Sequence, residues 1–529
     1  MKRSYSSQQH GLHRKLEIQG VPQKDDETGG FRFTRIFGQL PAFVVKQSAA
    51  DAIGAKMTSQ ADRRDSNIPA GYTYFGQFVD HDITLDRTEL ERDNQNTDTI
   101  EQTPIEDLFQ ARSPSLDLDS VYGNRLDNVI TPRQEDGVRF QLGITSTEGA
   151  IGQGHVDKTL PYDLPRHFQS DSGDARVLIP DARNDENLAV GQMHLLWLRF
   201  HNHVAEALGN YSTRGEELFA KTRDLVTRHY QYIVLHDFLR RIVAPDVYQR
   251  VILEGKSKYF TATCAEIPAM PLEFSVAAYR FGHSLVRETY DWNVNFSEGG
   301  QFPPANFGPA DNQTRSLSLF SFTSNAALQR RSLPTNWIID WRHFFDLRGT
   351  TTGVTIAPQM TKAIDPFLSI GMKEIPHIIP NLAAANLRRS GMRGLPSGQD
   401  VSRAMRDVSM LKPTEIVKNI AESDAEFAQM LKDMEFTKKA PLWFYILQEA
   451  NARHDGQHLG EMGSVIVAET FAALVKASRT SILCDGWHPA SDSILKTNDG
   501  KPIDSLPQLI AWIEEREPIV NPLEDPRLR

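Results

Sequence analysis

The sequence predicts a mainly α-helical fold, built as one large domain with long loops and few short strands. Three observations support this prediction. Several segments place apolar residues at helical spacing and contain few runs of β-branched residues. The stretches between them are rich in Pro, Gly, Asn and Asp, which favour loops. The sequence also holds no internal repeat and no low-complexity tract.

The predicted parts follow one another along the chain. Residues 1–65 are polar with scattered glycines and are expected to form an N-terminal surface arm. Residues 66–480 would form the main domain, and residues 481–529 a C-terminal extension packed on it, with a last short helix in Asp504–Glu517. The helices expected in the main domain are Tyr72–Leu85, Glu186–Leu208, Gly215–Ile242, Glu273–Val286, Thr414–Met434 and Pro441–Ala450.

The composition is that of a soluble globular protein. Of 529 residues, 40% are hydrophobic and 24% are charged. The 58 Lys and Arg residues face 68 Asp and Glu, so the net charge is −10, and no basic cluster is present. Nucleic acid is therefore not expected as a partner, because phosphates require a clustered basic face.

Cysteine content and hydropathy bear on location. Two cysteines, Cys264 and Cys484, permit one disulfide at most. No apolar run reaches the roughly 18 residues of a membrane-spanning helix, and the early basic residues are not followed by the apolar stretch of a secretory signal. We expect a soluble protein without an integral membrane segment, either cytoplasmic or secreted without an N-terminal signal peptide.

The most informative stretch is residues 71–85. On a helix, Gln77 and His81 lie four residues apart and share a face, while Asp80 and Asp82 flank the histidine. One histidine, one amide and two carboxylates in six residues cost free energy to bury without a function. The alternative is an exposed helix end with a surface histidine.

Two further clusters have plain structural explanations when taken singly. Arg183 and Glu186 stand at a helix start, where capping and the helix dipole account for polar residues. Arg280 and His283 share a face of an apolar helix, where Gly282 leaves room beside the histidine. A lone histidine on such a face is more often a core residue than a ligand.

Together these segments resemble the animal-type haem peroxidases, the superfamily of myeloperoxidase, lactoperoxidase and the cyclooxygenases. The order and internal spacing of four motifs agree over roughly residues 67–475. The resemblance implies a bacterial member with residues 66–480 as its catalytic domain. Its expected activity is reduction of hydrogen peroxide with oxidation of a small-molecule reductant (a phenol, halide or pseudohalide), in the response to oxidative stress.

The resemblance also implies a division of labour across a haem b. His81 would be the distal base, exchanging a proton with peroxide, and Arg183 would stabilise the negative charge that develops. Gln77 would line the distal pocket. His283 would be the proximal ligand of the haem iron.

Further residues match positions around the haem. Asn386 would orient the proximal ligand, and Arg280 and Arg389 would lie near the haem and its propionates. Asp80 and Glu186 match the carboxylates that form ester bonds to haem methyl groups. For Asn386 and the two arginines, the alternative is an ordinary helix with a solvated basic edge.

A calcium site is implied beside the distal histidine. In residues 113–123, expected to form a loop, oxygen-bearing side chains alternate along the chain, as a hard cation with many oxygen ligands requires. An acidic turn is the alternative, since Asp and Ser are common in loops. Calcium there would brace the helix that carries His81. The expected ligands are Asp82, Ser113, Ser115, Asp117 and Asp119.

The sequence departs from the family at three points. Asn187 stands where myeloperoxidase has a methionine that links to haem, which weakens the expectation of chloride oxidation. Residues 390–394 read Ser-Gly-Met-Arg-Gly, where the family commonly has Arg-Asp-His before the glycine. The many family disulfides are missing, which indicates a bacterial or otherwise intracellular branch.

Two alternatives belong to other functional classes. A fatty-acid dioxygenase of the cyclooxygenase branch needs a tyrosine three residues before the proximal histidine, where this chain has Arg280; Tyr279 is one residue off. A non-catalytic haem-fold protein used for binding or adhesion would tolerate loss of His81 or Arg183, and both are present. The peroxidase interpretation is therefore preferred.

Overall fold

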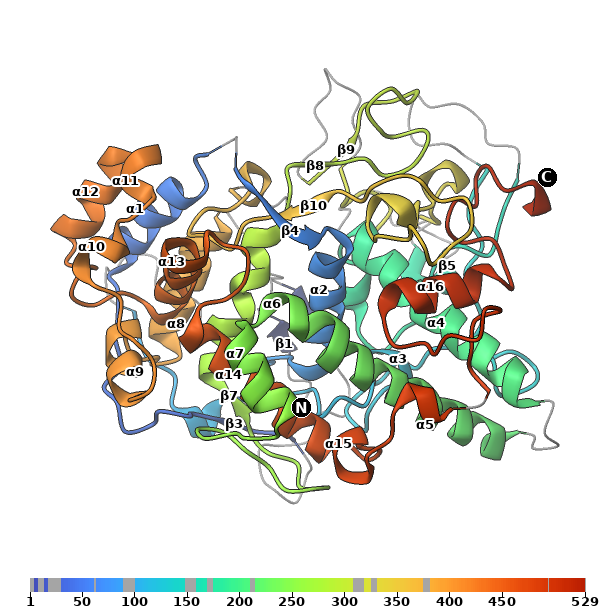
Figure 1. Ribbon diagram of the computed structural model, residues 1–529, viewed down its shortest axis with the longest axis horizontal. Helices are drawn as coiled ribbons and strands as arrows, with labels where there is room; N and C mark the ends of the chain where they lie inside the picture. The colour runs from blue at the N-terminus through green and yellow to red at the C-terminus, as the bar shows by residue number, and fades with distance from the viewer. Residues whose placement is uncertain are drawn as a thin grey trace.

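Helices make up most of the regular structure, as Figure 1 shows, and the strands are two to five residues long. The mainly α fold class is thus confirmed. The computed structural model describes residues 4–7, 14–17, 30–60, 63–88, 100–147, 158–168, 175–209, 215–307, 318–324, 331–373, 381–492 and 494–528.

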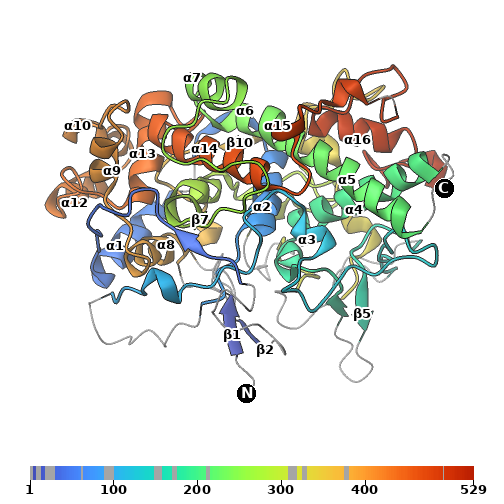
Figure 2. The ribbon, with the colours of Figure 1, turned by 90° about the horizontal axis from the view of Figure 1, so that it is seen from below.

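The central helix is α2 (Gly71–Ile83), which lies in the middle of the molecule in both Figure 1 and Figure 2. On one side lie α4 (Leu188–Gly209) and α5 (Glu216–Ile233). On the other lie α13 (Leu442–His454) and α14 (Glu461–Ala477).

Aromatic rings join the helices of this centre. Phe78 of α2 stacks on Trp197 of α4 with ring centroids 6.0 Å apart, and Trp197 meets Tyr230 of α5 edge-on at 5.3 Å. All three side chains are buried. Burying such large rings contributes strongly to core stability, so the position of α2 is fixed by packing on both neighbours.

The helix after α5 changes its winding. Residues Val234–Phe238 (η4) form a π-helical turn, and α6 (Leu239–Ile242) completes the predicted helix 215–242. The predicted helix 273–286 also differs in kind. It is a π turn at Glu273–Ala277 (η6) followed by a 3₁₀ helix at Ala278–Leu285 (η7).

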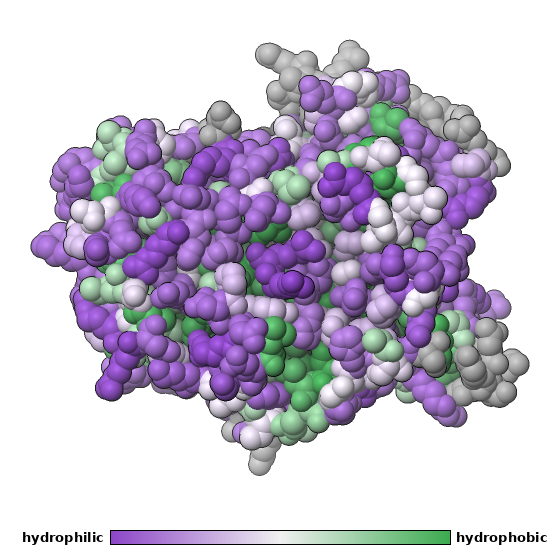
Figure 3. All heavy atoms as spheres, in the orientation of Figure 1, coloured by the Kyte–Doolittle hydropathy of each residue, from purple (hydrophilic) through white to green (hydrophobic). Residues whose placement is uncertain are grey.

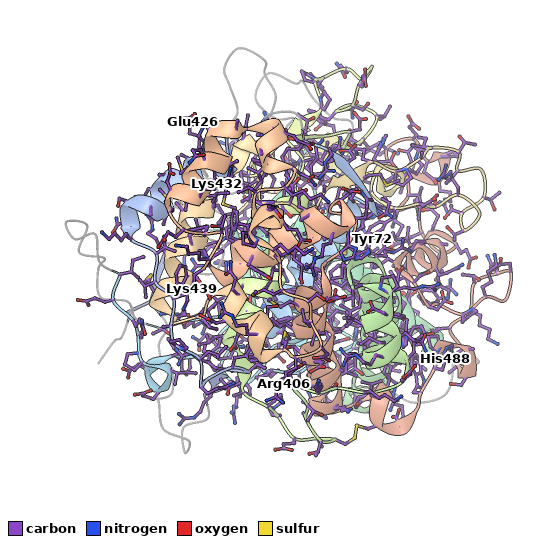
Figure 4. The ribbon with its side chains drawn as sticks, turned by 60° about the vertical axis from the view of Figure 1, so that its left-hand side comes forward. Tyr72, Arg406, Glu426, Lys432, Lys439 and His488 are labelled. Atoms are coloured by element: carbon purple, nitrogen blue, oxygen red, sulfur yellow. A yellow bond between two sulfur atoms is a disulfide. The ribbon has the colours of Figure 1, made fainter. Side chains whose placement is uncertain are left out.

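In the C-terminal half, the predicted helix 414–434 is three short helices: α10 (Pro413–Ile416), α11 (Ile420–Ser423) and α12 (Ala425–Asp433). Figure 4 shows Glu426 and Lys432 on the outer side of α12, while Phe427 and Leu431 are buried. The remaining α-helices are α1 (Gln47–Met57), α3 (Asp119–Tyr122), α7 (Pro245–Tyr248), α8 (Leu382–Met392), α9 (Gly398–Ala404), α15 (Ile482–Asp485) and α16 (Leu506–Glu514).

The described strands form five two-stranded pairs, four of them antiparallel. The parallel pair joins β3 (Phe33–Thr34) to β7 (Met270–Pro271). The antiparallel pairs are β1 (Ser4–Ser7) with β2 (Arg14–Glu17), β4 (Asp65–Pro69) with β10 (Met360–Lys362), β5 (Arg166–Phe168) with β6 (Ala175–Val177), and β8 (Thr289–Tyr290) with β9 (Ala305–Asn306).

Both ends of the chain pack on the main domain. In the predicted N-terminal arm, α1 lies so close to α8 that a Cβ at Gly54 would be 2.6 Å from the Ala384 nitrogen. At the C-terminal end, the Trp512 ring of α16 meets Phe200 of α4 at 5.5 Å. In the first 29 residues of the predicted arm, the structure describes only residues 4–7 and 14–17.

Surface hydropathy and helix length bear on membrane association. The face drawn in Figure 3 is mostly hydrophilic, with small apolar patches. Among the described residues, no helix combines the length and the apolar character needed to cross a bilayer.

Candidate active site

A cavity lies between α2, η4 and the η7 segment. Its walls are mainly aromatic and aliphatic, with a few polar groups, which is typical of cofactor and ligand sites. The residues that line it are Tyr72, Thr73, Tyr74, Gly76, Gln77, Asp80, Glu186, Asn187, Phe238, Tyr279, Arg280, Phe281, Gly282, His283, Leu285, Val286, Phe307, Phe320, Met372 and Leu382.

Polar groups from α2 and from the start of α4 meet at one side of the cavity. The Gln77 amide donates to Glu186 and accepts from Asn187 Nδ2 at 3.1 Å. His81 Nε2 lies 3.7 Å from Glu186 Oε1. Burial raises the pKa of Glu186 to about 8, so its carboxyl is mostly protonated near neutral pH.

His81 itself is buried behind this group, and Arg183 lies next to it. The Arg183 guanidinium donates to the carbonyl oxygens of His81 (3.1 Å) and Thr84 (2.7 Å) and forms an ion pair with Asp181 at 2.7 Å. Burial acts to raise the pKa of Asp181, but Arg183 and Arg112 hold it well below its usual range. Of the predicted distal residues, Gln77, Asp80 and Glu186 line the cavity. His81 and Arg183 are not among the lining residues and lie deeper in the protein.

His283 faces the cavity from η7. Its Nδ1 lies 2.8 Å from the Asn386 amide nitrogen, and Asn386 Oδ1 accepts from Arg280 Nη1 at 3.2 Å. A 3₁₀ helix has three residues per turn, so Arg280 and His283 share a face more closely than they would on an α-helix. The predicted grouping of His283, Asn386 and Arg280 is therefore present.

Arginines gather next to this group. Burial lowers the pKa of Arg280 to about 10, and burial together with Arg280 and Arg393 lowers that of Arg389 well below its usual range. Arg393 binds Asp86 through Nε at 3.0 Å and Nη2 at 2.6 Å. Of these three arginines, Arg393 is the one hydrogen-bonded to Asp86, and Arg389 Nη1 has no hydrogen-bond partner among the described residues. Such an excess of buried positive charge favours an anionic ligand.

The departure from the family at residues 390–394 has a structural explanation. Arg393 occupies the place before the glycine, and its side chain is 1% exposed. Besides its pair with Asp86, it donates to Thr103 Oγ1 at 3.1 Å. At this place the chain therefore has a buried ion pair between Arg393 and Asp86.

The predicted calcium residues also come together. Asp82 accepts the backbone N–H groups of Leu118 (3.3 Å) and Ser120 (3.1 Å). Ser113 donates to Asp119 at 2.6 Å. Burial and then Asp119 raise the pKa of Asp82 well above its usual value. Across the described ranges, no three His, Cys, Asp or Glu side chains are arranged as a metal site, and these oxygens are engaged in hydrogen bonds.

Several site residues were not identified from the sequence. Asn184 follows Arg183 directly and His194 lies two turns into α4, so their place in the second motif was the available signal. Asp86 and Arg393 are 307 residues apart, and Phe238, Phe307 and Phe320 reach the cavity from separate segments. No spacing in the sequence connects such distant residues.

Comparisons with known proteins agree on one family. The model of the family described as animal haem peroxidase matches residues 92–480. A peroxidasin homologue of Caenorhabditis elegans is 24% identical over 405 residues, covering 74% of this chain and 28% of that protein. A peroxidase-like protein of Margaritifera margaritifera is 26% identical over 303 residues, covering 51% and 38%. The chain thus spans less than two-fifths of the length of these relatives.

Solved structures show the same fold at low sequence identity. Peroxidase A from Dictyostelium discoideum superposes with a TM-score of 0.57 and 17% identity, covering 91% of this chain and 92% of that one. Fatty acid alpha-dioxygenase from Arabidopsis thaliana gives 0.56 and 14%, covering 90% and 77%. At these identities the likeness concerns the fold alone.

Proposed function

The chain belongs to the animal haem peroxidase family, and from that premise we propose that it is a haem peroxidase that reduces hydrogen peroxide and oxidises a small donor. The donor would be a phenol, a halide or a pseudohalide. The observation that carries this proposal is the presence of two groups of polar residues at one cavity, each with members in the cavity lining and a member behind it. One is His283 with Asn386 and Arg280, and the other is the cluster of Gln77, Glu186 and His81.

The residues present fit haem b. The cavity has the apolar walls that a macrocycle requires, and His283 presents an imidazole to it. The excess positive charge of Arg280, Arg389 and Arg393 would hold the propionates. When bound, the haem supplies an iron centre that exchanges electrons with peroxide and with the donor. Asp80 and Glu186 line the same cavity and would be the sites of any ester links.

The protein's own groups would manage the proton. His81 Nε2, which lies 3.7 Å from the cavity-lining Glu186, would take a proton from one peroxide oxygen and return it to the other as that oxygen leaves. Glu186, uncharged near neutral pH, would not stabilise the charged form of the imidazole, which favours a neutral ring able to accept a proton. Arg183, fixed next to the His81 carbonyl, would favour developing negative charge through its field.

Calcium would bind next to this machinery. Burial and the nearby Asp119 carboxylate raise the pKa of Asp82, and a cation would relieve the repulsion between the two carboxylates. The serines and Asp117 would complete an oxygen-rich site.

The proposal is tested by loading the purified protein with haem and following peroxide-dependent oxidation of a phenol. We expect a Soret band, peroxide consumption and donor oxidation. His283→Ala should lose the Soret band. His81→Ala should keep it but consume peroxide roughly 10²–10⁴-fold more slowly, the usual contribution of a general acid–base group.

A matched control is His167→Ala, because His167 is an exposed histidine on β5, outside the residues that line the cavity. That variant should behave as wild type. A haem-loaded protein with no peroxide-dependent oxidation, or a Soret band that survives His283→Ala, would refute the proposal.

A further inference from the structure

Asn184 links His81 to a second buried histidine. The Asn184 oxygen lies 2.8 Å from His81 Nδ1, and its amide nitrogen lies 2.9 Å from His194 Nδ1. All three side chains have 0% exposure. A fully buried chain of three polar side chains is costly unless its members satisfy one another.

His194 is suited to orient this amide and unsuited to carry charge. Burial lowers its pKa to about 3, so the ring is neutral at working pH. Its Nε2 has no hydrogen-bond partner in the described part of the chain, and its ring meets Phe78 edge-on at 5.8 Å. A neutral imidazole that accepts at Nδ1 carries its proton on Nε2.

The turn that carries Asn184 is clamped on both sides. Within η3 (Ala182–Asp185), the Asn184 N–H donates to the Asp181 carbonyl at 3.0 Å. Before it, Arg183 is paired with Asp181, and after it, Asp185 accepts two bonds of 2.8 Å from Arg166. The amide is therefore held by its backbone as well as by its two partners.

From this geometry we propose that Asn184 and His194 are positioning residues for His81. His194 accepts from the amide nitrogen, which turns the amide oxygen toward His81. His81 then carries its proton on Nδ1 and keeps the Nε2 lone pair for the substrate side. The inference rests on the proposed function, because it assigns His81 the part of base.

The same chain has a consequence for the proton that His81 accepts. With a proton on both nitrogens, the ring is a cation, and its Nδ1–H bond to the Asn184 oxygen becomes charge-assisted. His194 does not draw the proton further inward, since its burial keeps it neutral. The proton therefore stays on His81, where it can be returned to the leaving oxygen.

The test uses variants that remove one link at a time. Asn184→Ala removes the acceptor for His81. His194→Phe removes the acceptor for Asn184 but keeps a ring against Phe78, and His194→Gln offers an oxygen in its place. His229→Phe is the control, since His229 is another buried histidine in edge contact with a phenylalanine, and it hydrogen-bonds to the Leu225 carbonyl.

In the haem-loaded protein, we measure the rate of peroxide consumption. Asn184→Ala should lower it about 10- to 100-fold, the usual effect of losing a partner that orients a site residue. His194→Phe should lower it by a smaller factor, and His194→Gln should restore most of the rate. In a His81→Ala background, Asn184→Ala should cause no further loss, because coupled residues are not additive.

A second readout needs no haem. In protein labelled with [¹⁵N]histidine, a ring N–H resonance that disappears in His81→Ala should be that of Nδ1, and it should also disappear in Asn184→Ala. A His81 proton on Nε2 would overturn the inference. Wild-type rates of peroxide consumption in both Asn184→Ala and His194→Phe would also overturn it. So would an equal loss of rate when Asn184→Ala is introduced into wild type and into His81→Ala.

These outcomes separate the inference from the proposed function. A His81→Ala protein as fast as wild type would refute the role of His81 as base, while the ring resonance would still report whether Asn184 orients it. Should Asn184→Ala fail to fold, Asn184→Asp keeps the acceptor oxygen, and His194→Phe tests the same link from the other end.

Discussion

At the scale of single residues, the charge states in the site are set by the burial of its ionisable groups and by their charged neighbours. Burial disfavours whichever form is charged. It therefore raises the pKa of Glu186 and lowers that of Arg280. The cavity holds an uncharged acid on one side and poorly compensated cations on the other. The first arrangement suits proton transfer at His81, and the second suits binding of an anion.

The Glu186 carboxyl should leave a signature in the pH dependence of stability. Its pKa is about 8 in the folded chain against an ordinary value of 4.5. Between these values the folded chain holds a proton that the unfolded chain has released. The free energy of unfolding should therefore fall as pH rises through this window, by up to about 1.4 kcal/mol per pH unit from this group.

Urea unfolding of haem-free protein at several values between about pH 5 and 8 measures this slope. Glu186→Gln is uncharged at every pH and should flatten it, whereas Glu216→Gln, at an exposed side chain of α5, should not. The same slope in wild type and Glu186→Gln would show that Glu186 is ionised in the folded protein.

Arg389 should trade stability for haem binding. It is a buried cation beside Arg280 and Arg393, with one guanidinium nitrogen lacking a partner in the described structure. Replacing such a group can stabilise a protein by about 1–4 kcal/mol. Arg389→Gln should therefore unfold at higher urea without haem, yet bind haem more weakly because a propionate loses its cation.

The control for this prediction is the neighbouring residue. Arg388 is partly exposed and pairs with Asp51, so Arg388→Gln should change neither property by much. Haem titration followed at the Soret band and urea unfolding give the two readouts. Unchanged haem affinity in Arg389→Gln would remove Arg389 from the propionate site.

At the scale of elements, α2 connects the two predicted sites. Its last turn carries His81, whose neighbour Asp82 accepts backbone N–H groups from the start of α3. The same helix carries Gln77 and packs on α4 through Phe78 and Trp197. A ligand that binds Asp82 together with the loop before α3 should therefore also stabilise the end of α2, which bears the proposed base.

Calcium should raise the thermal stability of the protein through this loop. A ligand that binds only the folded state at 100 times its Kd adds about 2.7 kcal/mol. Wild type should melt at lower temperature in chelator than in calcium. Asp82→Asn keeps an oxygen for the backbone N–H groups but loses the charge, so its melting temperature should respond much less.

Asp246→Asn, at an exposed carboxylate on α7, is the matched control and should respond as wild type does. Elemental analysis of dialysed protein gives an independent measurement. Absence of calcium together with equal melting temperatures in calcium and chelator would reduce the site to the acidic turn that the loop composition also allows.

The elements show what the sequence could and could not predict. Helices α2 and α4 were predicted because apolar residues recur on one face. The segment 273–286 was predicted as a regular helix, although a π turn and a 3₁₀ helix replace it. Helix α14 was missed, because nearly all its residues are buried and it lacks an amphipathic pattern.

For the candidate site, Gln77 and His81 were within reach of the sequence because their spacing on one helix is local, whereas Glu186 and His283 were identified through the resemblance to a known family. Partners such as Asp86 with Arg393 were not, because 307 residues separate them. Only the tertiary fold brings the end of α8, where Arg393 lies, next to Asp86. The sequence therefore predicts the chemistry of the site better than its electrostatics.

At the scale of the whole molecule, one covalent link ties the chain together. Cys264 and Cys484 form a disulfide, visible as a yellow bond in Figure 4, which joins the loop before β7 to α15 across 220 residues. This agrees with the limit of one bridge that the cysteine count sets. The bridge lies at the surface and attaches α15, which precedes α16, to the loop before β7.

Removing the bridge should lower stability. Closing a loop of this length restricts the unfolded chain, and losing such a link costs about 2–5 kcal/mol. Cys484→Ser should therefore unfold at lower urea than wild type, and wild type treated with a reductant should match it. Equal unfolding free energies for oxidised wild type and Cys484→Ser would show that packing of α16 on α4 suffices.

At the scale of the whole molecule, the peroxidase and fatty-acid dioxygenase branches of the superfamily remain to be distinguished. The fold is shared by a peroxidase and by fatty acid alpha-dioxygenases, so the choice depends on the site. The resemblance implies that a fatty-acid dioxygenase would carry a radical-forming tyrosine three residues before its proximal histidine, and in this chain Arg280 stands three residues before His283, the proposed ligand. Tyr279 lines the cavity, but it lies a third of a turn away on η7 and donates to the Gly76 carbonyl at 3.2 Å.

The haem-loaded enzyme should therefore oxidise phenols, iodide or bromide with peroxide and consume little oxygen with linoleate or arachidonate. Tyr279→Phe should leave peroxide-dependent turnover nearly unchanged, because that turnover needs the proton chemistry of His81 and not a radical at Tyr279. An oxygen electrode and a phenol assay on the same preparations measure both. Rapid oxygen uptake with a fatty acid in wild type, lost in Tyr279→Phe, would place the enzyme in the dioxygenase branch, with its radical one residue away from the expected position.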